Sequence, residues 1–171
     1  MKKVLIMDTS ILCVWLEVPG MATCGPKADK WDKPRVTEKI DAEITARSTL
    51  VLPLATLIET GNHIAQAKHS RRERGDALGE LMRLSADEQT PWAAFSDQHT
   101  LWTPEKLKEL AASWPALAEG QRLSLGDATI KDVAEYYAQM GCEIEILTGD
   151  HGLKAYEPLA PVEIPRRRQP R

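Results

Sequence analysis

The chain has 171 residues, of which 43% are hydrophobic and 27% charged, as in a globular protein with one packed core rather than a disordered chain. Its formal net charge of −3 is unusual for a protein that binds nucleic acid, because phosphate backbones are commonly held by an excess of cations. Three cysteines, Cys13, Cys24 and Cys142, cannot all pair within one chain and lack the spacing of a zinc or redox motif, so we expect reduced thiols.

The first element is a short apolar run at residues 4–7 that ends at Asp8. Such a run is typical of a strand that is buried on both faces, as in a parallel sheet covered by helices. Asp8 interrupts the run and no small-residue cleavage site follows, so we expect no signal peptide. No stretch approaches the roughly 20 apolar residues of a membrane-spanning helix, and we expect a cytoplasmic protein.

Residues 11–18 are predicted to begin a helix, and the glycines and prolines between residues 19 and 34 indicate an irregular stretch. Thr37 is then expected to cap a second helix. A second strand is predicted at residues 50–52.

Apolar residues recur with helical spacing in residues 54–65 and again in residues 77–84, so both segments are predicted helices. The pattern loosens between residues 87 and 121, where we expect a helical insertion. Within it, Thr103 is the expected N-cap of a helix that ends before Pro115.

Aromatic side chains are concentrated in this insertion: Trp92, Phe95, Trp102 and Trp114. Such residues can stack on nucleic-acid bases, as they do in proteins that bind single strands. More often they pack together, so we expect a small satellite core here.

A last helix is predicted from residue 126 to residue 140, with Ser124 as its cap and Gly141 at its end. Residues 143–148 then alternate as a strand does, and residues 162–164 are a candidate edge strand. Strands alternating with helices predict a three-layer α/β/α fold with a central, mainly parallel sheet of four to five strands. We expect one domain over residues 1–165 and a basic tail at 166–171.

Basic residues cluster locally in spite of the negative total charge. The clusters are Lys27, Lys30, Lys33 and Arg35; Lys68, Arg71, Arg72 and Arg74; and Arg166, Arg167, Arg168 and Arg171. Each of them is either a solvated face or a surface that binds anions, and the sequence leaves both readings open.

Four carboxylates are expected at one edge of the predicted sheet. Asp8 ends the first strand, Asp150 follows the strand at 143–148, Asp127 lies in the first turn of the last helix, and Glu59 lies on the helix after the second strand. Ligands of open parallel sheets bind outside the carboxyl ends of the strands. Like charges gathered there repel one another unless cations neutralise them, and oxygen-only ligands select Mg²⁺ or Mn²⁺. Such a centre hydrolyses phosphodiesters.

Each carboxylate also has a plainer interpretation. Asp127 favours a helix N-terminus electrostatically, and Asp8 and Asp150 suit turns at strand ends. Glu59 lies about 140° from the apolar stripe of its helix, which suits solvent as well as a cleft. Asp132 points almost opposite to the apolar stripe of the last helix, so we expect it to be solvated.

Four segments of the chain resemble the motifs of PIN domains, a family that includes the VapC-like ribonuclease toxins. They are residues 4–10 (VLIMDTS), 57–62 (LIETGN), 123–130 (LSLGDATI) and 146–150 (ILTGD). A strand that ends in Asp occurs in many α/β proteins, so each motif alone is weak. Their order and spacing over residues 1–155 make the resemblance specific.

The resemblance implies a metal-dependent endoribonuclease with an acidic pocket of Asp8, Glu59, Asp127 and Asp150, which would be both catalytic residues and ligands of Mg²⁺ or Mn²⁺. Its implied partners are an RNA substrate, a cognate antitoxin if the chain is a toxin, and a second copy in a homodimer. Helper contacts are expected from the hydroxyls of Thr9, Ser10 and Thr148, although local turn hydrogen bonds suit them equally. His63 is either a proton donor to this pocket or an ordinary surface histidine.

Two other functions remain open. The first is a PIN-like module that binds RNA or protein without turnover. The second is a phosphatase of the haloacid-dehalogenase type, but that family requires an aspartate where this chain has Ser10. The chain departs from the shortest PIN domains in the loop at 19–34 and in the insertion at 87–121, so RNA choice and partner binding are not fixed by the resemblance.

Overall fold

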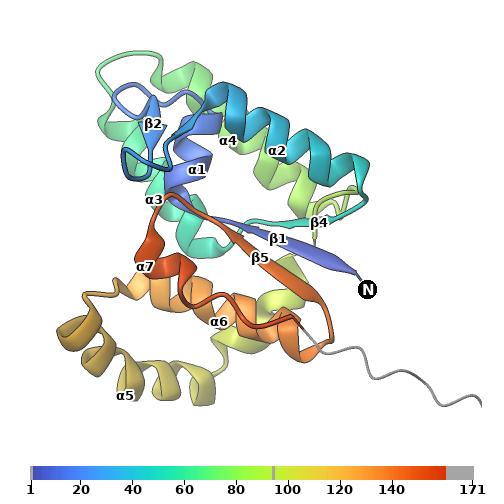
Figure 1. Cartoon of the computed structure of the whole chain (residues 1–171), viewed down its shortest axis with the longest axis vertical. Coiled ribbons are helices and arrows are strands. Elements are labelled where there is room, and N and C mark those ends of the chain that lie inside the picture. Colours follow the sequence, from blue (N-terminus) through green and yellow to red (C-terminus); the bar gives the residue numbers. More distant parts are fainter. Residues whose placement is uncertain (1, 94, 161–171) are drawn as a thin grey trace, which may run out of the picture.

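The computed structural model describes residues 2–93 and 95–160, which contain both helices and strands (Figure 1). In chain order the elements are β1 (Lys3–Met7), α1 (Thr9–Trp15), β2 (Thr23–Cys24), β3 (Trp31–Asp32), α2 (Lys33–Thr45), β4 (Thr49–Val51), α3 (Leu54–Gln66), α4 (Arg71–Ala86), the 3₁₀-helix η1 (Phe95–Trp102), α5 (Pro104–Gln121), α6 (Leu125–Gln139), β5 (Glu143–Leu147) and α7 (His151–Lys154). None of the helices in this part of the chain combines the length and the apolar character that crossing a membrane requires.

The central sheet consists of β4, β1 and β5, all parallel, with β1 in the middle. Ile6 of β1 pairs with Val51 on one side and with Ile146 on the other. The expected α/β organisation is confirmed, but the described residues contribute three strands to this sheet instead of the expected four to five. The edge strand expected at 162–164 lies outside the described residues.

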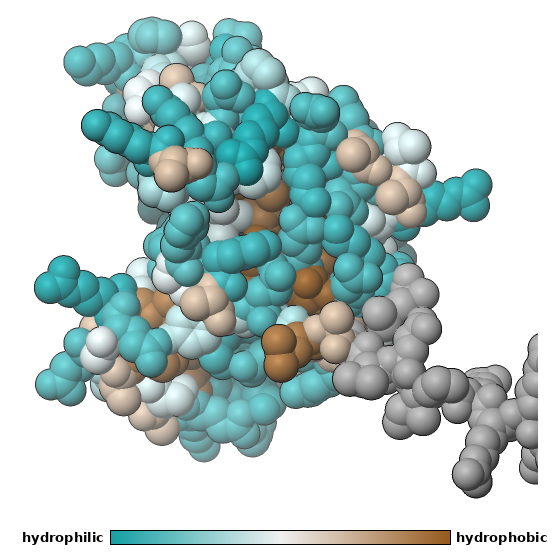
Figure 2. Space-filling view, in the orientation of Figure 1, coloured by the Kyte–Doolittle hydropathy of each residue, from teal (hydrophilic) through white to brown (hydrophobic). Residues whose placement is uncertain are grey.

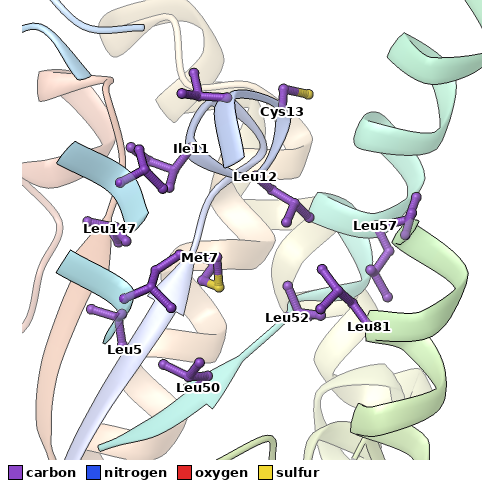
Figure 3. Close-up of a cluster of buried hydrophobic side chains, with 14 of the residues drawn as sticks. Leu5, Met7, Ile11, Leu12, Cys13, Leu50, Leu52, Leu57, Leu81 and Leu147 are labelled. Atoms are coloured by element: carbon purple, nitrogen blue, oxygen red, sulfur yellow. The ribbon is translucent and has the colours of Figure 1, made fainter. Parts of the chain in front are cut away.

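The two faces of the sheet are covered by different helices, because successive side chains of a strand point to opposite faces. Leu5 and Met7 belong to a cluster that α1, α2, α3 and α4 complete, and Figure 3 shows part of this cluster. Val4 and Ile6 face a second cluster, to which α6 and Leu153 of α7 contribute. Each such side chain stabilises the fold by roughly 1.5–3 kcal/mol when it is fully buried. The central strand is therefore fixed from both sides.

Each outer strand of the sheet has one residue whose outward backbone groups bond to another part of the chain. Leu50 of β4 exchanges backbone hydrogen bonds of 2.8 and 2.9 Å with residues 91–93. On β5, the amide of Ile146 donates to the Glu157 carboxylate at 2.7 Å, and Lys154 Nζ donates to the Ile146 carbonyl at 3.0 Å. The backbone groups of these two residues therefore have partners although the described residues form no further strand beside them.

The irregular stretch expected at residues 19–34 contains a short hairpin, which we call the β2–β3 hairpin (residues 23–32). Its strands pair antiparallel, Thr23 with Asp32 and Cys24 with Trp31. Strands of two residues are too short to produce an alternating pattern, so hydrophobic periodicity does not predict them. The hairpin is separate from the central sheet.

Helix α2 begins earlier than expected. Asp32 is its N-cap and accepts a hydrogen bond of 3.0 Å from the amide of Arg35. The expectation that Thr37 caps this helix is wrong, because Thr37 lies within it. Asp32 followed by Pro34 is the stronger start, since proline already has the backbone angle of the first helical turn.

Helix α5 begins as expected, with Thr103 as the N-cap that accepts from the amide of Lys106. The expected end before Pro115 is wrong, because α5 continues through this proline to Gln121. A proline inside a helix removes one backbone hydrogen bond. The indole of the preceding Trp114 donates a 3.0 Å hydrogen bond to the Leu123 carbonyl, which ties α5 to the segment before α6 on the far side of the proline.

The expectation of a satellite core is wrong for Trp92. Its ring is buried in the main core, with its centroid 6.3 Å from that of Trp15. The backbone of Trp92 lies beside β4, where it forms an isolated bridge with Leu50. The side chain of Phe95 lies outside the described part of the structure.

A group of four charged side chains joins α2 to the sheet. Lys3 of β1 and Lys39 of α2 each form ion pairs with both Glu43 and Glu145, at N···O distances between 2.5 and 2.8 Å. The hydroxyl of Ser48 donates a further hydrogen bond to Glu43. Burial alone would raise the pKa of Glu43, but hydrogen bonds from the two lysines and Ser48 lower it to about 2. The folded state therefore stabilises the charged form of Glu43.

We predict that this group makes the fold sensitive to acid. The Glu43 pKa lies below its unfolded value of 4.5, so its contribution is complete above pH 4.5 and is lost as the pH falls through 2. The shift corresponds to about 3 kcal/mol at neutral pH. Glu43→Gln should lower the free energy of unfolding by this order at pH 7 and by much less at pH 2, measured by urea denaturation.

The matched control is Glu38→Gln, which changes an exposed glutamate on the same helix. It should have little effect at either pH. A Glu43→Gln penalty that is the same at pH 7 and pH 2 would contradict the proposed role of the ion pairs.

Candidate functional site

The site is centred on Asp8, which follows β1 and is only 5% exposed. Its carboxylate caps α1 by accepting hydrogen bonds from the amides of Thr9 (2.6 Å) and Ser10 (3.3 Å). It also accepts from the hydroxyls of Ser10 (2.6 Å) and Thr148 (2.8 Å). The carboxyl ends of β1 and β5 are therefore joined through one buried carboxylate.

Asp150 lies beside this carboxylate at the end of β5. Its amide donates to the Thr148 hydroxyl at 2.9 Å, and its own carboxylate caps α7 by accepting from the amide of Gly152 at 2.7 Å. The amide of Gly149, between these two residues, donates to Ser10 Oγ at 3.0 Å. Thr148 and Ser10 thus connect the two aspartates, although Asp150 itself is exposed.

Glu59 reaches the same place from α3, where it lies between the first turns of α1 and α6. Its Oε2 accepts a hydrogen bond of 3.1 Å from the Thr9 hydroxyl. Its Oε1 lies so close to Gly126 that a Cβ added there would be 2.2 Å away. Glycine at position 126 therefore leaves room for the Glu59 carboxylate.

Asp127 follows Gly126 in the first turn of α6. Ser124 is the N-cap of this helix, as expected, and accepts from the Asp127 amide at 3.0 Å. The Ser124 hydroxyl in turn donates to the Asp127 carboxylate at 2.8 Å. Asp127 therefore takes part in capping the helix while it lies next to Glu59.

The four carboxylates lie near enough to affect one another's charge. Burial raises the pKa of Glu59, and the charges of Asp127 and Asp8 raise it further, against the hydrogen bond from Thr9. Burial also raises the pKa of Asp127, as do the charges of Asp8 and Asp150, against the hydrogen bond from Ser124. Negative charge from four separate segments is thus concentrated at the carboxyl end of the sheet.

This set of donors suits a hard divalent cation in its chemistry, since every side-chain ligand would be an oxygen. Among residues 2–93 and 95–160, however, no group of three or more histidine, cysteine, aspartate or glutamate side chains is arranged to hold a metal ion. Glu59 and Asp127 are instead hydrogen-bonded to the hydroxyls of Thr9 and Ser124. The acids are neighbours, but they do not form a coordination sphere.

The other residues singled out in the sequence take different places. Thr9, Ser10 and Thr148 all hydrogen-bond to the acidic side chains, as expected for helper contacts. His63 is exposed on α3, and its charge lowers the pKa of Glu59. Asp132 lies away from the site, partly buried in a groove between α5 and α6, so the expectation of full solvation is not met.

Sequence reasoning missed a hollow of about 430 Å³ next to the acids. We call it the hairpin hollow, and it is lined by Ser10, Cys24, Gly25, Pro26, Gly149, Asp150 and His151. One wall comes from the β2–β3 hairpin, which lies against Gly149 so closely that a Cβ there would be 2.7 Å from Cys24 Sγ. Only the turn residues Gly25 and Pro26 pointed to a defined structure in this segment.

The chain matches no model of a known protein family, no curated protein and no solved structure. No residue role is therefore carried over from a relative. A function for the site has to follow from its side chains and their surroundings.

We predict that Thr148→Val destabilises the fold, because the variant removes a donor from the buried Asp8 carboxylate and an acceptor from the Asp150 amide. The expected loss is about 1–3 kcal/mol in the free energy of unfolding, measured by urea denaturation. Thr49→Val on β4 is the control, since the Thr49 hydroxyl has no hydrogen-bond partner within the described residues. An equal effect of the two substitutions would argue against the bridging role of Thr148.

Proposed function

We propose that this chain is a metal-dependent endoribonuclease, a phosphodiester hydrolase of the PIN-domain type, whose site is formed by Asp8, Glu59, Asp127 and Asp150. One observation carries the proposal: carboxylates from four separate segments lie at the carboxyl end of one parallel sheet, where burial and mutual repulsion raise the pKa of Glu59 and of Asp127. Concentrating negative charge in this way is costly for a fold and favourable for a site that takes up a cation.

The chain's own residues would bind the metal ion and hold the carboxylates in position. Ser10 and Thr148 hold the Asp8 carboxylate in one position, and Thr9 donates to Glu59. When bound, Mg²⁺ or Mn²⁺ would supply the positive charge that activates water and neutralises the charge developing on the phosphodiester. No side chain has to act as a covalent nucleophile.

The proposal carries a structural requirement. Because the described residues are not arranged as a metal site, Glu59 and Asp127 have to turn away from Thr9 and Ser124 when an ion binds. Rotation of exposed or half-buried side chains is fast and needs no change in the backbone. The buried Asp8 would stay where its four hydrogen bonds hold it.

One alternative has an observation in its favour. Each of Asp8, Asp127 and Asp150 takes part in capping a helix, and the described residues form no ready metal site. A PIN-like module that binds RNA or protein without turnover would need no more than this. Calorimetric titration with Mn²⁺ separates the two, since the enzyme requires measurable binding and the module does not.

The direct test is cleavage of a labelled single-stranded RNA by the purified protein in Mg²⁺ or Mn²⁺. We expect cleavage that a chelator abolishes and that Asp8→Asn lowers by at least about 100-fold, because a ligand and an electrostatic contact are lost together. The matched control is Asp41→Asn, an exposed aspartate on α2, which should cleave as the unmodified protein does. Cleavage that persists in both the chelator and Asp8→Asn would refute the proposal.

A second variant keeps all four carboxylates. Gly126→Ala should displace the Glu59 carboxylate, since the new methyl group would meet Glu59 Oε1. The fold should lose little stability because the group that moves is the end of a flexible side chain, and alanine favours the helix by roughly 0.5–1 kcal/mol. We expect an RNA cleavage rate at least about 10-fold lower, because misplacing a reacting group by 1 Å can cost about 100-fold.

The control for this variant is Gly79→Ala on α4, where an added Cβ meets nothing within 4 Å. It should leave cleavage unchanged and raise the free energy of unfolding by roughly 0.5–1 kcal/mol, since alanine favours a helix over glycine. Full activity in Gly126→Ala would mean that the reaction does not need the Glu59 carboxylate in its place beside Gly126.

The resemblance to PIN domains also suggests a biological role and an oligomeric state, for which the geometry of the site is no evidence. We propose that the chain is a toxin that acts in the cytoplasm as a homodimer. A cognate antitoxin would hold its activity in check. Sedimentation of the purified protein tests the homodimer. A small reading frame immediately upstream of the gene would support the antitoxin.

A further inference from the structure

We propose that the β2–β3 hairpin binds the phosphate backbone of the RNA strand next to the four carboxylates, with Lys27 and Lys30 as its phosphate contacts and the hairpin hollow as the place of one nucleotide. This inference rests on the proposed function for the choice of RNA. It adds a substrate-binding element that none of the four PIN-like motifs contains.

The hairpin has a fixed position relative to the acids. At Gly149 an added Cβ would lie 2.7 Å from Cys24 Sγ and 2.8 Å from the Gly25 amide nitrogen, so the hairpin backbone lies directly on the segment between Thr148 and Asp150. The hairpin hollow opens between this contact and α7, and Asp150 lines it. A ligand in the hollow is therefore adjacent to the acidic site.

The hairpin is also internally braced. The Arg35 guanidinium stacks 3.8 Å from the centroid of the Trp31 ring, donates to the Lys30 carbonyl at 2.8 Å and pairs with Asp29 at 2.7 Å. Gly25 has a φ of +86°, and a Cβ there would lie 2.5 Å from the Asp29 carbonyl oxygen. Arg35 and Asp29 are thus occupied with holding the turn, and the turn is preorganised for a ligand.

The lysines of the turn, in contrast, have no such partners in the part of the chain that the structure describes. Lys27 and Lys30 are exposed, and within the described residues neither of them forms an ion pair. Residues 25–35 contain four basic and two acidic side chains, a local charge of +2 on a chain whose total is −3. Figure 2 shows hydrophilic residues over the corner of the molecule where Figure 1 has β2.

The positive charge of the hairpin would offset the repulsion between the acidic site and a phosphodiester. Four carboxylates repel a phosphodiester, so a strand that approaches them requires cations nearby that are not neutralised within the protein. The hairpin hollow, at about 430 Å³, is within the usual range for small-molecule pockets and is lined by a serine, a histidine and backbone of two glycines. These features fit a nucleotide unit whose neighbouring phosphates meet Lys27 and Lys30.

The test measures binding of a fluorescein-labelled 12-nucleotide single-stranded RNA by anisotropy, in Mg²⁺, over a series of KCl concentrations. Asp8→Asn serves as the background so that the RNA stays intact, and circular dichroism checks its fold. Adding Lys27→Gln and Lys30→Gln should weaken binding about 10-fold at 100 mM salt and reduce the slope of log K against log salt by about 1.4, the value for two lost contacts.

The matched control adds Lys2→Gln and Lys108→Gln, which change the charge equally but lie before β1, at the opposite end of the sheet, and on α5. This control should bind almost as the background does. An effect of the control pair equal to that of the hairpin pair would overturn the inference, because the lysines would then act only through total charge.

A second measurement uses the unmodified protein and needs no variant. Brief acetylation of lysines with and without RNA, in chelator, followed by mass spectrometry, should show protection of Lys27 and Lys30 but not of Lys2 and Lys108. Unprotected hairpin lysines on RNA-bound protein would overturn the inference. If the hairpin binds RNA but no cleavage occurs, the nuclease proposal fails and the proposed RNA contact of the hairpin is retained. If cleavage occurs but the salt slope is unchanged in the hairpin variant, the RNA contact of the hairpin fails and the nuclease proposal is retained.

Discussion

The carboxylate of Asp8 is the constraint on which the end of the sheet depends. A carboxylate that is 5% exposed is tolerated only when hydrogen bonds replace its water, and here two amides and two hydroxyls do so. One of these donors, Thr148, belongs to the segment after β5, and its hydroxyl also accepts a hydrogen bond from the Asp150 amide. Satisfying one buried charge therefore sets the position of α1, of the end of β5 and of the turn into α7. The candidate site is built on the same contacts.

Much of the fold follows from local patterns. The apolar run before Asp8 indicates a buried central strand, and Ser124 followed by Asp127 marks the start of α6, because a cap is a local signal. Other features depend on contacts between distant segments. Trp92 belongs to the main core because its backbone bridges to Leu50, about 40 residues earlier, and no local pattern reports that. At the start of α2, Asp32 is the cap in place of the expected Thr37, because Pro34 in the first turn favours the earlier start.

The sequence indicates which acidic residues lie near one another, but not how their side chains are oriented. Order along the chain and the position of strand ends indicate that the four acids lie at one edge, since parallel strands share that edge. Whether they point at a common ion depends on side-chain hydrogen bonds, and here Thr9 and Ser124 engage Glu59 and Asp127. Each acid therefore serves the fold locally while it adds to a shared negative charge. The strands of the hairpin could not be predicted, because each has two residues and their position depends on contacts with Gly149 and on Arg35 over Trp31.

The covered edges of the sheet restrict how this chain can associate with others. Residues 91–93 occupy the outer side of β4 at Leu50, and the side chains of Lys154 and Glu157 occupy the backbone of Ile146 on β5. A strand whose outward backbone groups are already bonded is a poor template for an incoming extended peptide, so strand addition into a shared sheet or a fibril is disfavoured at Leu50 and at Ile146. A second protein that approaches over the helical surfaces is recognised through side chains, which can be altered without disturbing the backbone ladder.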